Sequence, residues 1–213
     1  MTATDYRDTI FALSSGAPPS GLAVIRLSGP NVRFALETMT GVVPSPRRAV
    51  LADICNRNRK VIDRGLVLYF PGPHSFTGED CAEFHVHGGM AVIAAMLSAL
   101  SSIQGLRSAE PGEFSRRAFE NGKMDLTAVE GLADLISAET EAQRKMALEQ
   151  STGSLQEVYS RWRKELIRIR AMIEADFDFA DEEDVPGSVA KTIWTNVGSL
   201  RNEIAHHLEN ARA

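Results

Sequence analysis

The stretch CAEFHVHGG, residues 81–89, decides how the first half of this chain folds. Its apolar and polar side chains alternate, which is typical of a β-strand with one buried face. One face carries Ala82, Phe84 and Val86, and the other carries Cys81, Glu83, His85 and His87. Two glycines follow, and then residues 90–103 place apolar side chains at helical spacing. The stretch therefore predicts a strand, a glycine turn and a helix.

Further strand signals lie upstream of this unit. Residues 9–13 and 22–27 are β-rich runs, and the loop between them is rich in Gly and Pro. Residues 31–39 are expected to form a short helix, and residues 65–70 another strand. The N-terminal half is therefore predicted to be a mixed α/β domain.

Helix signals dominate downstream. Pro111 is expected to open a helix that runs to about Asn121, with Gly122 as its stop and Lys123 just beyond. Thr127 has capping-box spacing before an apolar run, so a new helix is expected to begin there. We therefore predict an α+β chain in which residues 1–122 form the mixed domain and residues 123–213 form a helical domain.

Two long amphipathic helices are expected in the helical domain, because apolar residues recur every three or four positions. The first series is Leu155, Val158, Trp162, Leu166, Ile169 and Ile173, and the second is Ile193, Val197, Leu200, Ile204 and Leu208. Joined by an acidic turn, the two helices should pack antiparallel. The pattern is still helical at Ala213 without a stop signal, so we interpret the chain as part of a longer protein.

The composition is that of a folded globular chain and excludes several classes of protein. The 213 residues include 23 Lys and Arg against 28 Asp and Glu, and a net charge of −5 argues against wholesale wrapping of nucleic acid. The two cysteines form no Cys-x-x-Cys pair, so no disulfide framework is expected. The N-terminus has no apolar signal segment, and no apolar run reaches the ~20 residues of a membrane span. These features predict a cytoplasmic protein without a membrane segment.

Three features of the sequence bear on its chemistry. Glu83, His85 and His87 share a strand face, but neighbours there are ~7 Å apart and no companion motif adds ligands, so no metal site is predicted. Gly88-Gly89 has the composition to hold an anion at a helix start, although a tight turn is the favoured interpretation. No Gly-x-x-x-x-Gly-Lys-Ser/Thr sequence occurs, so no P-loop is present to bind GTP.

Seven short segments form a more specific pattern. They are DTI (8–10), IRLSG (25–29), SFTGED (75–80), HGG (87–89), PGEFSRRAF (111–119), NGKMDL (121–126) and DLI (134–136). Together they resemble the MnmE (TrmE) family of bacterial tRNA-modification GTPases. The resemblance is close over residues 8–183 and looser over the last helix.

The resemblance implies an N-terminal tetrahydrofolate-binding domain that forms a homodimer, followed by a central helical domain that contains an inserted GTPase domain. It implies that the whole protein works with a flavin-dependent partner, MnmG (GidA), on tRNA. The complex would add an aminomethyl or carboxymethylaminomethyl group at carbon 5 of the wobble uridine. 5-Formyltetrahydrofolate or another tetrahydrofolate derivative would supply the one-carbon unit. GTP, Mg and K would belong to the GTPase domain, which is expected to lie outside these residues, so the sequence leaves open whether this chain alone is an enzyme.

Carried over residue by residue, the family's folate contacts fall on Arg26, Glu83 and Lys123, and no catalytic residue is assigned. A carboxylate such as Glu83 can accept two N–H bonds from a pterin, and Arg or Lys can pair with the carboxylates of the folate tail. The sequence leaves open which of Arg26 and Lys123 meets the tail. Two alternatives also stay open, a stand-alone folate-dependent one-carbon transferase and a truncated chain that only dimerises.

Overall fold

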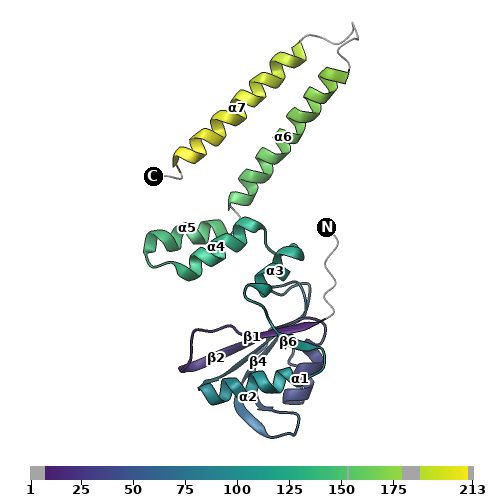
Figure 1. The fold of residues 1–213 in the computed structure, drawn as a ribbon, viewed down its shortest axis with the longest axis vertical. Helices are drawn as coiled ribbons and strands as arrows, with labels where there is room; N and C mark the ends of the chain where they lie inside the picture. Colours follow the sequence, from purple (N-terminus) through teal and green to yellow (C-terminus); the bar gives the residue numbers. More distant parts are fainter. Residues whose placement is uncertain (1–7, 153, 179–187, 211–213) are drawn as a thin grey trace. The chain divides into compact units, whose positions relative to one another are not determined.

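The computed structural model describes residues 8–152, 154–178 and 188–210. The chain divides into two compact units between Val129 and Glu130 (Figure 1). The first unit contains β1 (Thr9–Leu13), β2 (Ser20–Ser28), α1 (Val32–Thr40), β3 (Val50–Cys55), β4 (Val61–Phe70), β5 (Cys81–Gly88), α2 (Met90–Ser101), β6 (Leu106–Ser108), α3 (Glu113–Glu120) and the start of α4 (Leu126–Ser137). The second contains the rest of α4, α5 (Glu141–Ser151), α6 (Ser154–Asp178) and α7 (Ser188–Asn210). The α+β class predicted from the sequence is confirmed.

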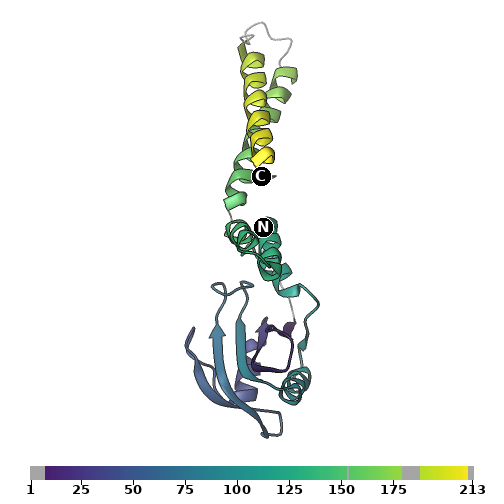
Figure 2. The same ribbon diagram turned by 90° about the vertical axis from the view of Figure 1, so that its left-hand side faces the viewer.

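A six-stranded sheet in the order β3-β4-β5-β2-β1-β6 forms the centre of the first unit. Only the β1–β6 pair is parallel, and the other neighbours are antiparallel. Residues of α1 and α2 join the inward-facing strand residues in one apolar core, and α2 lies against the sheet in both views (Figures 1 and 2). Strand β5 lies between β4 and β2, so side chains on its outward face are flanked by those of both neighbours.

The alternation predicted for β5 is confirmed by burial. Ala82, Phe84 and Val86 are at most 1% exposed, and they pack in the same core as Phe11 of β1. The glycine turn that follows has a packing reason. A Cβ on Gly88 would overlap the backbone of Ser20, its register partner on β2, so the β2–β5 pairing requires glycine there.

Helix α3 begins later than predicted, at Glu113, because Gly112 takes a left-handed φ of +75° and stands before the first turn. Its predicted stop is confirmed, since Gly122 has a φ of +67°. The N–H of Gly122 donates to the Phe119 carbonyl, and that of Lys123 donates to the Ala118 carbonyl. This pair of bonds is a Schellman motif, which satisfies the last carbonyls of the helix.

The capping residue predicted for the next helix was wrong. Helix α4 begins at Leu126, and Asp125 caps it by accepting the N–H of Ala128 and the hydroxyl of Thr127. The capping box that the structure does contain belongs to α5, where Thr140 and Gln143 bond reciprocally. The capping-box spacing at Thr127 thus indicated the start of α4 to within two residues, but the carboxylate of Asp125 is the group that caps it.

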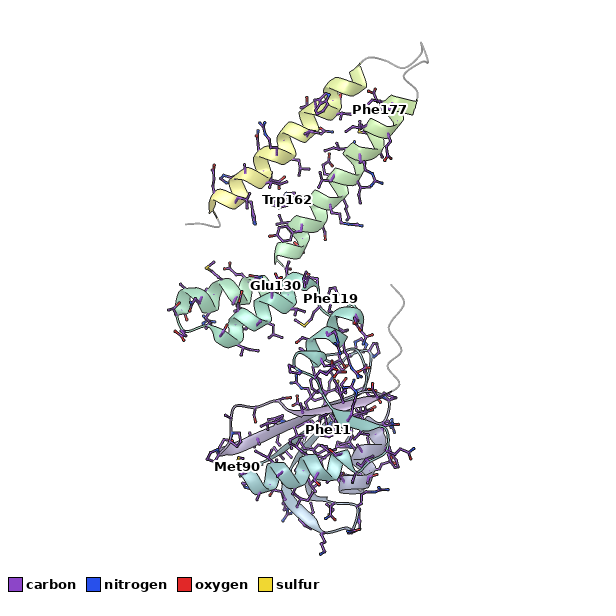
Figure 3. The ribbon with its side chains drawn as sticks, viewed as in Figure 1. Phe11, Met90, Phe119, Glu130, Trp162 and Phe177 are labelled. Atoms are coloured by element: carbon purple, nitrogen blue, oxygen red, sulfur yellow. The ribbon has the colours of Figure 1, made fainter. Side chains whose placement is uncertain are left out.

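Helices α6 and α7 lie side by side and antiparallel, as predicted (Figures 1 and 2). Trp162 near the start of α6 contacts His207 near the end of α7, with ring centroids 5.3 Å apart. Ile169, Ile193 and Leu200 form the buried part of their contact, and Trp162 packs against it (Figure 3).

Two members of the predicted stripes are not buried between the helices. Leu166 is 53% exposed and Leu208 is 56% exposed, because the contact between two helices is narrower than the apolar stripe of each. The acidic turn and the side chain of Leu155 lie outside the described residues. Within the described part of the chain, no helix is long and apolar enough to cross a membrane.

Candidate ligand-binding site

A pocket of about 370 Å³ opens on the polar side of the sheet. Its lining comes from β2, β4, β5, the loop between β4 and β5, and the segment before β3. The lining residues are Arg26, Arg47, Phe70, His74, Ser75, Phe76, Cys81 and Glu83. Two of the three predicted site residues, Arg26 and Glu83, therefore line one pocket.

Arg26 and Glu83 are opposite each other in the β2–β5 register and form an ion pair. Nη2 of Arg26 donates to Oε1 of Glu83 at 2.9 Å, and Nε donates to the same oxygen at 3.0 Å. The guanidinium also lies over the ring of Phe76, 5.2 Å from its centroid, and 6.0 Å from that of Phe114. These contacts fix the guanidinium and, through it, the carboxylate.

Glu83 stays ionised although it is half-buried. Burial opposes its charge, but hydrogen bonds with His85 and Arg26 outweigh that effect and hold its pKa below the ordinary value. Its second oxygen, Oε2, lies 3.1 Å from Nε2 of His85. The carboxylate is thus a charged acceptor at the wall of the pocket.

The two histidines of β5 do not converge with Glu83 on one point. His87 turns to Asp63 of β4, with Nδ1 2.9 Å from Oδ1. Cys81 shares their face of β5 but is buried, because Thr77 and Ser28 lie against its sulfur. Among the residues that the structure describes, no three His, Cys, Asp or Glu side chains are arranged to hold a metal ion.

Lys123, the third predicted site residue, is not among the residues that line the pocket. It follows α3 immediately, and its side chain lies on the loop that ends at Asp80. A Cβ added to Gly78 would lie 3.2 Å from its Cγ and 3.3 Å from its Cδ. Lys123 and the pocket therefore meet the same loop, at Gly78 and at Ser75 and Phe76 respectively.

A second charged cluster, which sequence reasoning missed, lies beneath this loop. Arg117 and Glu113 of α3 have fully buried side chains and pair at 2.9 Å. Arg117 also bonds Asp8 at 2.9 Å and Glu79 at 3.2 Å, and Arg107 of β6 bonds Glu113 at 2.6 Å. Three of the seven short segments, residues 8–10, 75–80 and 111–119, meet here, and each supplies a charged residue. Those charged residues were the signal in the sequence that could have predicted this cluster.

Hydrogen bonds extend this cluster to the loop above it. The Ser28 hydroxyl donates to Oε2 of Glu79 at 2.5 Å and lies 2.6 Å from the hydroxyl of Thr77. Nδ2 of Asn121 donates to the Thr77 carbonyl at 2.8 Å. The loop is therefore held from below, and its residues Ser75 and Phe76 are presented to the pocket.

The pocket offers an ionised carboxylate, two aromatic rings and two guanidinium groups. A carboxylate accepts N–H donors, aromatic rings contact flat ligands, and a guanidinium binds a carboxylate or phosphate. These groups suit a planar ligand that carries N–H donors and an anionic group. The fold and site thus define a class of protein, a mixed-sheet domain with a polar pocket followed by a helical domain.

Comparison with known proteins identifies the group within this class. The family described as GTP-binding protein TrmE N-terminus matches residues 9–123, and the MnmE helical domain matches residues 126–213. The chain is 58% identical over 207 residues to the tRNA modification GTPase MnmE of Brucella canis and to that of Brucella ovis. Each alignment covers 97% of this chain and 47% of the relative. The chain belongs to the MnmE (TrmE) family and spans about half the length of these relatives.

Proposed function

We propose that this chain binds a tetrahydrofolate derivative such as 5-formyltetrahydrofolate, as part of a protein that modifies tRNA. The observation that carries the proposal is the pocket in which Arg26 holds an ionised Glu83 and lies over the ring of Phe76, with Phe70 also in the lining. A pterin is flat and presents adjacent N–H donors, which is the chemistry this carboxylate and these rings accept. The relatives are named tRNA modification GTPases, which supports tRNA as the final substrate of the whole protein.

The carboxylate must be shared between protein and ligand. A carboxylate has about four lone-pair positions, and Arg26 and His85 take up three in the described structure. A pterin that bonds through two N–H groups would therefore displace His85 and leave the Arg26 pair in place. Bound folate would supply the one-carbon unit, and the residues of this chain would bind and orient it.

Lys123 remains part of the proposal as a contact for ligand atoms that extend beyond the pocket across Gly78. Its N–H is one of the two donors of the Schellman motif, which fixes where its backbone lies. We also propose residue 122 as the end of the folate-binding domain, because α3 closes there and the family match changes between residues 123 and 126.

The wider activity belongs to the proposal for the whole protein. It includes GTP hydrolysis with Mg and K, cooperation with MnmG (GidA) on tRNA in the cytoplasm, and addition of the aminomethyl or carboxymethylaminomethyl group at carbon 5 of the wobble uridine. We do not expect the 213 residues to bind GTP, because their sequence contains no P-loop.

We propose that the chain forms a homodimer through its N-terminal domain. Leu51 and Leu66 are opposite each other in the β3–β4 register and are 56% and 42% exposed. Exposed apolar side chains on a sheet face are typical of an interface. Light scattering at tens of micromolar protein is expected to give the mass of a dimer, and a monomer mass would overturn this part.

Calorimetric titration of 5-formyltetrahydrofolate into the chain tests the proposed function. Saturable binding with one site per chain supports it, and absence of binding by the folded chain rejects it. A dimer that binds no folate would favour the dimerisation-only alternative. One-carbon transfer by the chain alone would favour the stand-alone transferase, which the names of the relatives do not support.

A further inference from the structure

The two guanidinium groups that line the pocket differ in how their charge is balanced. That of Arg26 is paired with Glu83 at 2.9 Å. That of Arg47 contacts no carboxylate among the described residues, and its side-chain partners are the carbonyl of His74 and the ring of Phe70. The pocket therefore contains one positive charge that the surrounding protein leaves uncompensated.

Arg47 is also held in an unusual backbone conformation. Its φ is +61°, and Arg59 is the one other non-glycine residue of the described segments with a positive φ. This region is sterically costly for a residue with a Cβ, so it persists where surrounding contacts impose it. The N–H of Arg47 donates to the Tyr69 carbonyl at 2.9 Å, which ties this backbone to the end of β4 beside Phe70.

These contacts orient a guanidinium that still has N–H groups to donate. The His74 carbonyl takes a bond from Nη2, and the Phe70 ring lies 5.8 Å from the central carbon of the guanidinium. A guanidinium carries five N–H donors, and only Nη2 of Arg47 donates to a described protein acceptor. The N–H groups of Nη1 and Nε are therefore available to a ligand carboxylate that enters the pocket. Little side-chain freedom remains to be lost on binding, because the stacked and bonded side chain is already placed.

We propose that Arg47 binds the carboxylate of the glutamate tail and so determines that the pocket selects folates over tail-less pterins. This inference rests on the proposed function and answers the question that the sequence left open between Arg26 and Lys123. The charge of Arg26 is already paired with Glu83, and Lys123 does not line the pocket. Arg47 lines the pocket, and its charge is not paired with any described carboxylate.

The test compares two ligands and two variants of the full 213-residue chain. 5-Formyltetrahydrofolate carries the glutamate tail, and the amide of 5-formyltetrahydropteroate, called the pteroate below, has neither that tail nor a free carboxylate. Arg47→Gln removes the proposed contact, and Arg48→Gln removes the same charge from the next residue, which is exposed like Arg47 but does not line the pocket. Thermal melting of each variant shows whether it is folded.

We expect wild type to bind the folate about tenfold more tightly than the pteroate, as one charge-assisted hydrogen bond would provide. Arg47→Gln should lose that preference by binding the folate about tenfold more weakly and the pteroate unchanged. Arg48→Gln should keep the preference. Raising the salt concentration should weaken the folate preference of wild type and leave that of Arg47→Gln unchanged.

Several outcomes would overturn the inference, and they differ from failure of the proposed function. If wild type binds neither ligand, the proposed function fails and the inference fails with it. If wild type binds both and Arg47→Gln weakens both equally, Arg47 shapes the pocket and does not meet the tail. Equal effects of Arg47→Gln and Arg48→Gln would show a general charge effect in place of a specific contact.

Discussion

Two Arg–Glu pairs in the N-terminal unit use the same chemistry for different ends. Arg117 and Glu113 pair at 2.9 Å with both side chains fully buried. Arg26 and Glu83 pair at the same distance, but their side chains are 29% and 18% exposed and line a pocket. The distance between the charges therefore does not distinguish the two pairs. They differ in exposure, because only the Arg26–Glu83 pair can be reached by a ligand.

Burial decides what each pair does for the protein. Ions sealed from water must have their charge and hydrogen bonds satisfied by neighbours, and removing one partner leaves the other stranded. A partly exposed pair can exchange a partner for water or for a ligand at small cost. The loop between β4 and β5 contacts both pairs, since Glu79 bonds Arg117 and Phe76 stacks on Arg26. The sealed pair, Arg117–Glu113, thus supports the loop whose Phe76 contacts the open pair, Arg26–Glu83.

Removing the sealed cation should have the largest effect. Arg117→Met leaves the buried Glu113 with Arg107 and the more distant Arg116, and it removes one partner each from Asp8 and Glu79. We expect the free energy of unfolding to fall by about 3–5 kcal/mol. Urea denaturation followed by circular dichroism measures it. Arg116→Met, on the same helix, is the control, because its 49% exposed side chain pairs with Glu110 at 3.1 Å and lies farther from Glu113, at 3.7 Å. It should cost at most about 1 kcal/mol. Equal losses in the two variants would contradict the distinction.

The sealed carboxylate should make stability depend on pH. Burial opposes its charge, but bonds from Arg107, the Glu110 N–H and Arg117 outweigh it and lower the pKa of Glu113 to about 2. Because this value lies below the ordinary 4.5, the stabilisation is complete above pH 4.5 and is lost as the pH falls toward 2. The difference in unfolding free energy between wild type and Glu113→Gln should shrink by about 3 kcal/mol over that range. A difference that does not change with pH would show that the partners of Glu113 do not lower its pKa.

The open carboxylate should matter more for binding than for stability. Glu83→Gln offers one acceptor oxygen and an NH₂ group that would face a ligand donor, so the affinity for 5-formyltetrahydrofolate should fall about hundredfold. Losing the charge opposite Arg26 should lower the free energy of unfolding by only about 1 kcal/mol. Calorimetric titration and urea denaturation measure the two quantities. Unchanged affinity in a folded variant would remove Glu83 from the site.

The corresponding change in the sealed pair is the matched control. Glu113→Gln should reverse the order of effects, with a larger loss of stability and no direct loss of folate affinity, because Glu113 does not line the pocket. If both glutamine variants lost affinity and stability in the same proportion, the two clusters would act as one.

Strain in the shared loop should have the smallest effect. Gly78 has a φ of +83°, and an added Cβ would lie 3.2 Å from Cβ of Asn121. Gly78→Ala should therefore lower the free energy of unfolding by about 1–2 kcal/mol. Gly16→Ala, where a Cβ would meet nothing within 4 Å, is the control and should leave thermal melting unchanged. A harmless Gly78→Ala would show that the loop adapts without disturbing either pair.

Local patterns were enough to predict much of this protein. The period of two in residues 81–87 identified the buried face of β5, and the periods of three and four identified α6 and α7. These predictions succeeded because side-chain direction repeats with the backbone geometry of each element. The seven short segments were specific enough to indicate the family before any fold was known.

The site depended on distances that no local pattern contains. Arg26 and Glu83 are 57 residues apart, and Arg117 and Asp8 are 109 apart, so only strand register and helix docking brought them together. The same register paired Arg26 with Glu83, while the fold of the preceding segment placed Arg47 in their pocket and left Lys123 outside it. Sequence by itself determined which faces would be apolar and which family the chain resembles. The tertiary structure decided which charges were sealed and which stayed open, because burial depends on what packs above a residue.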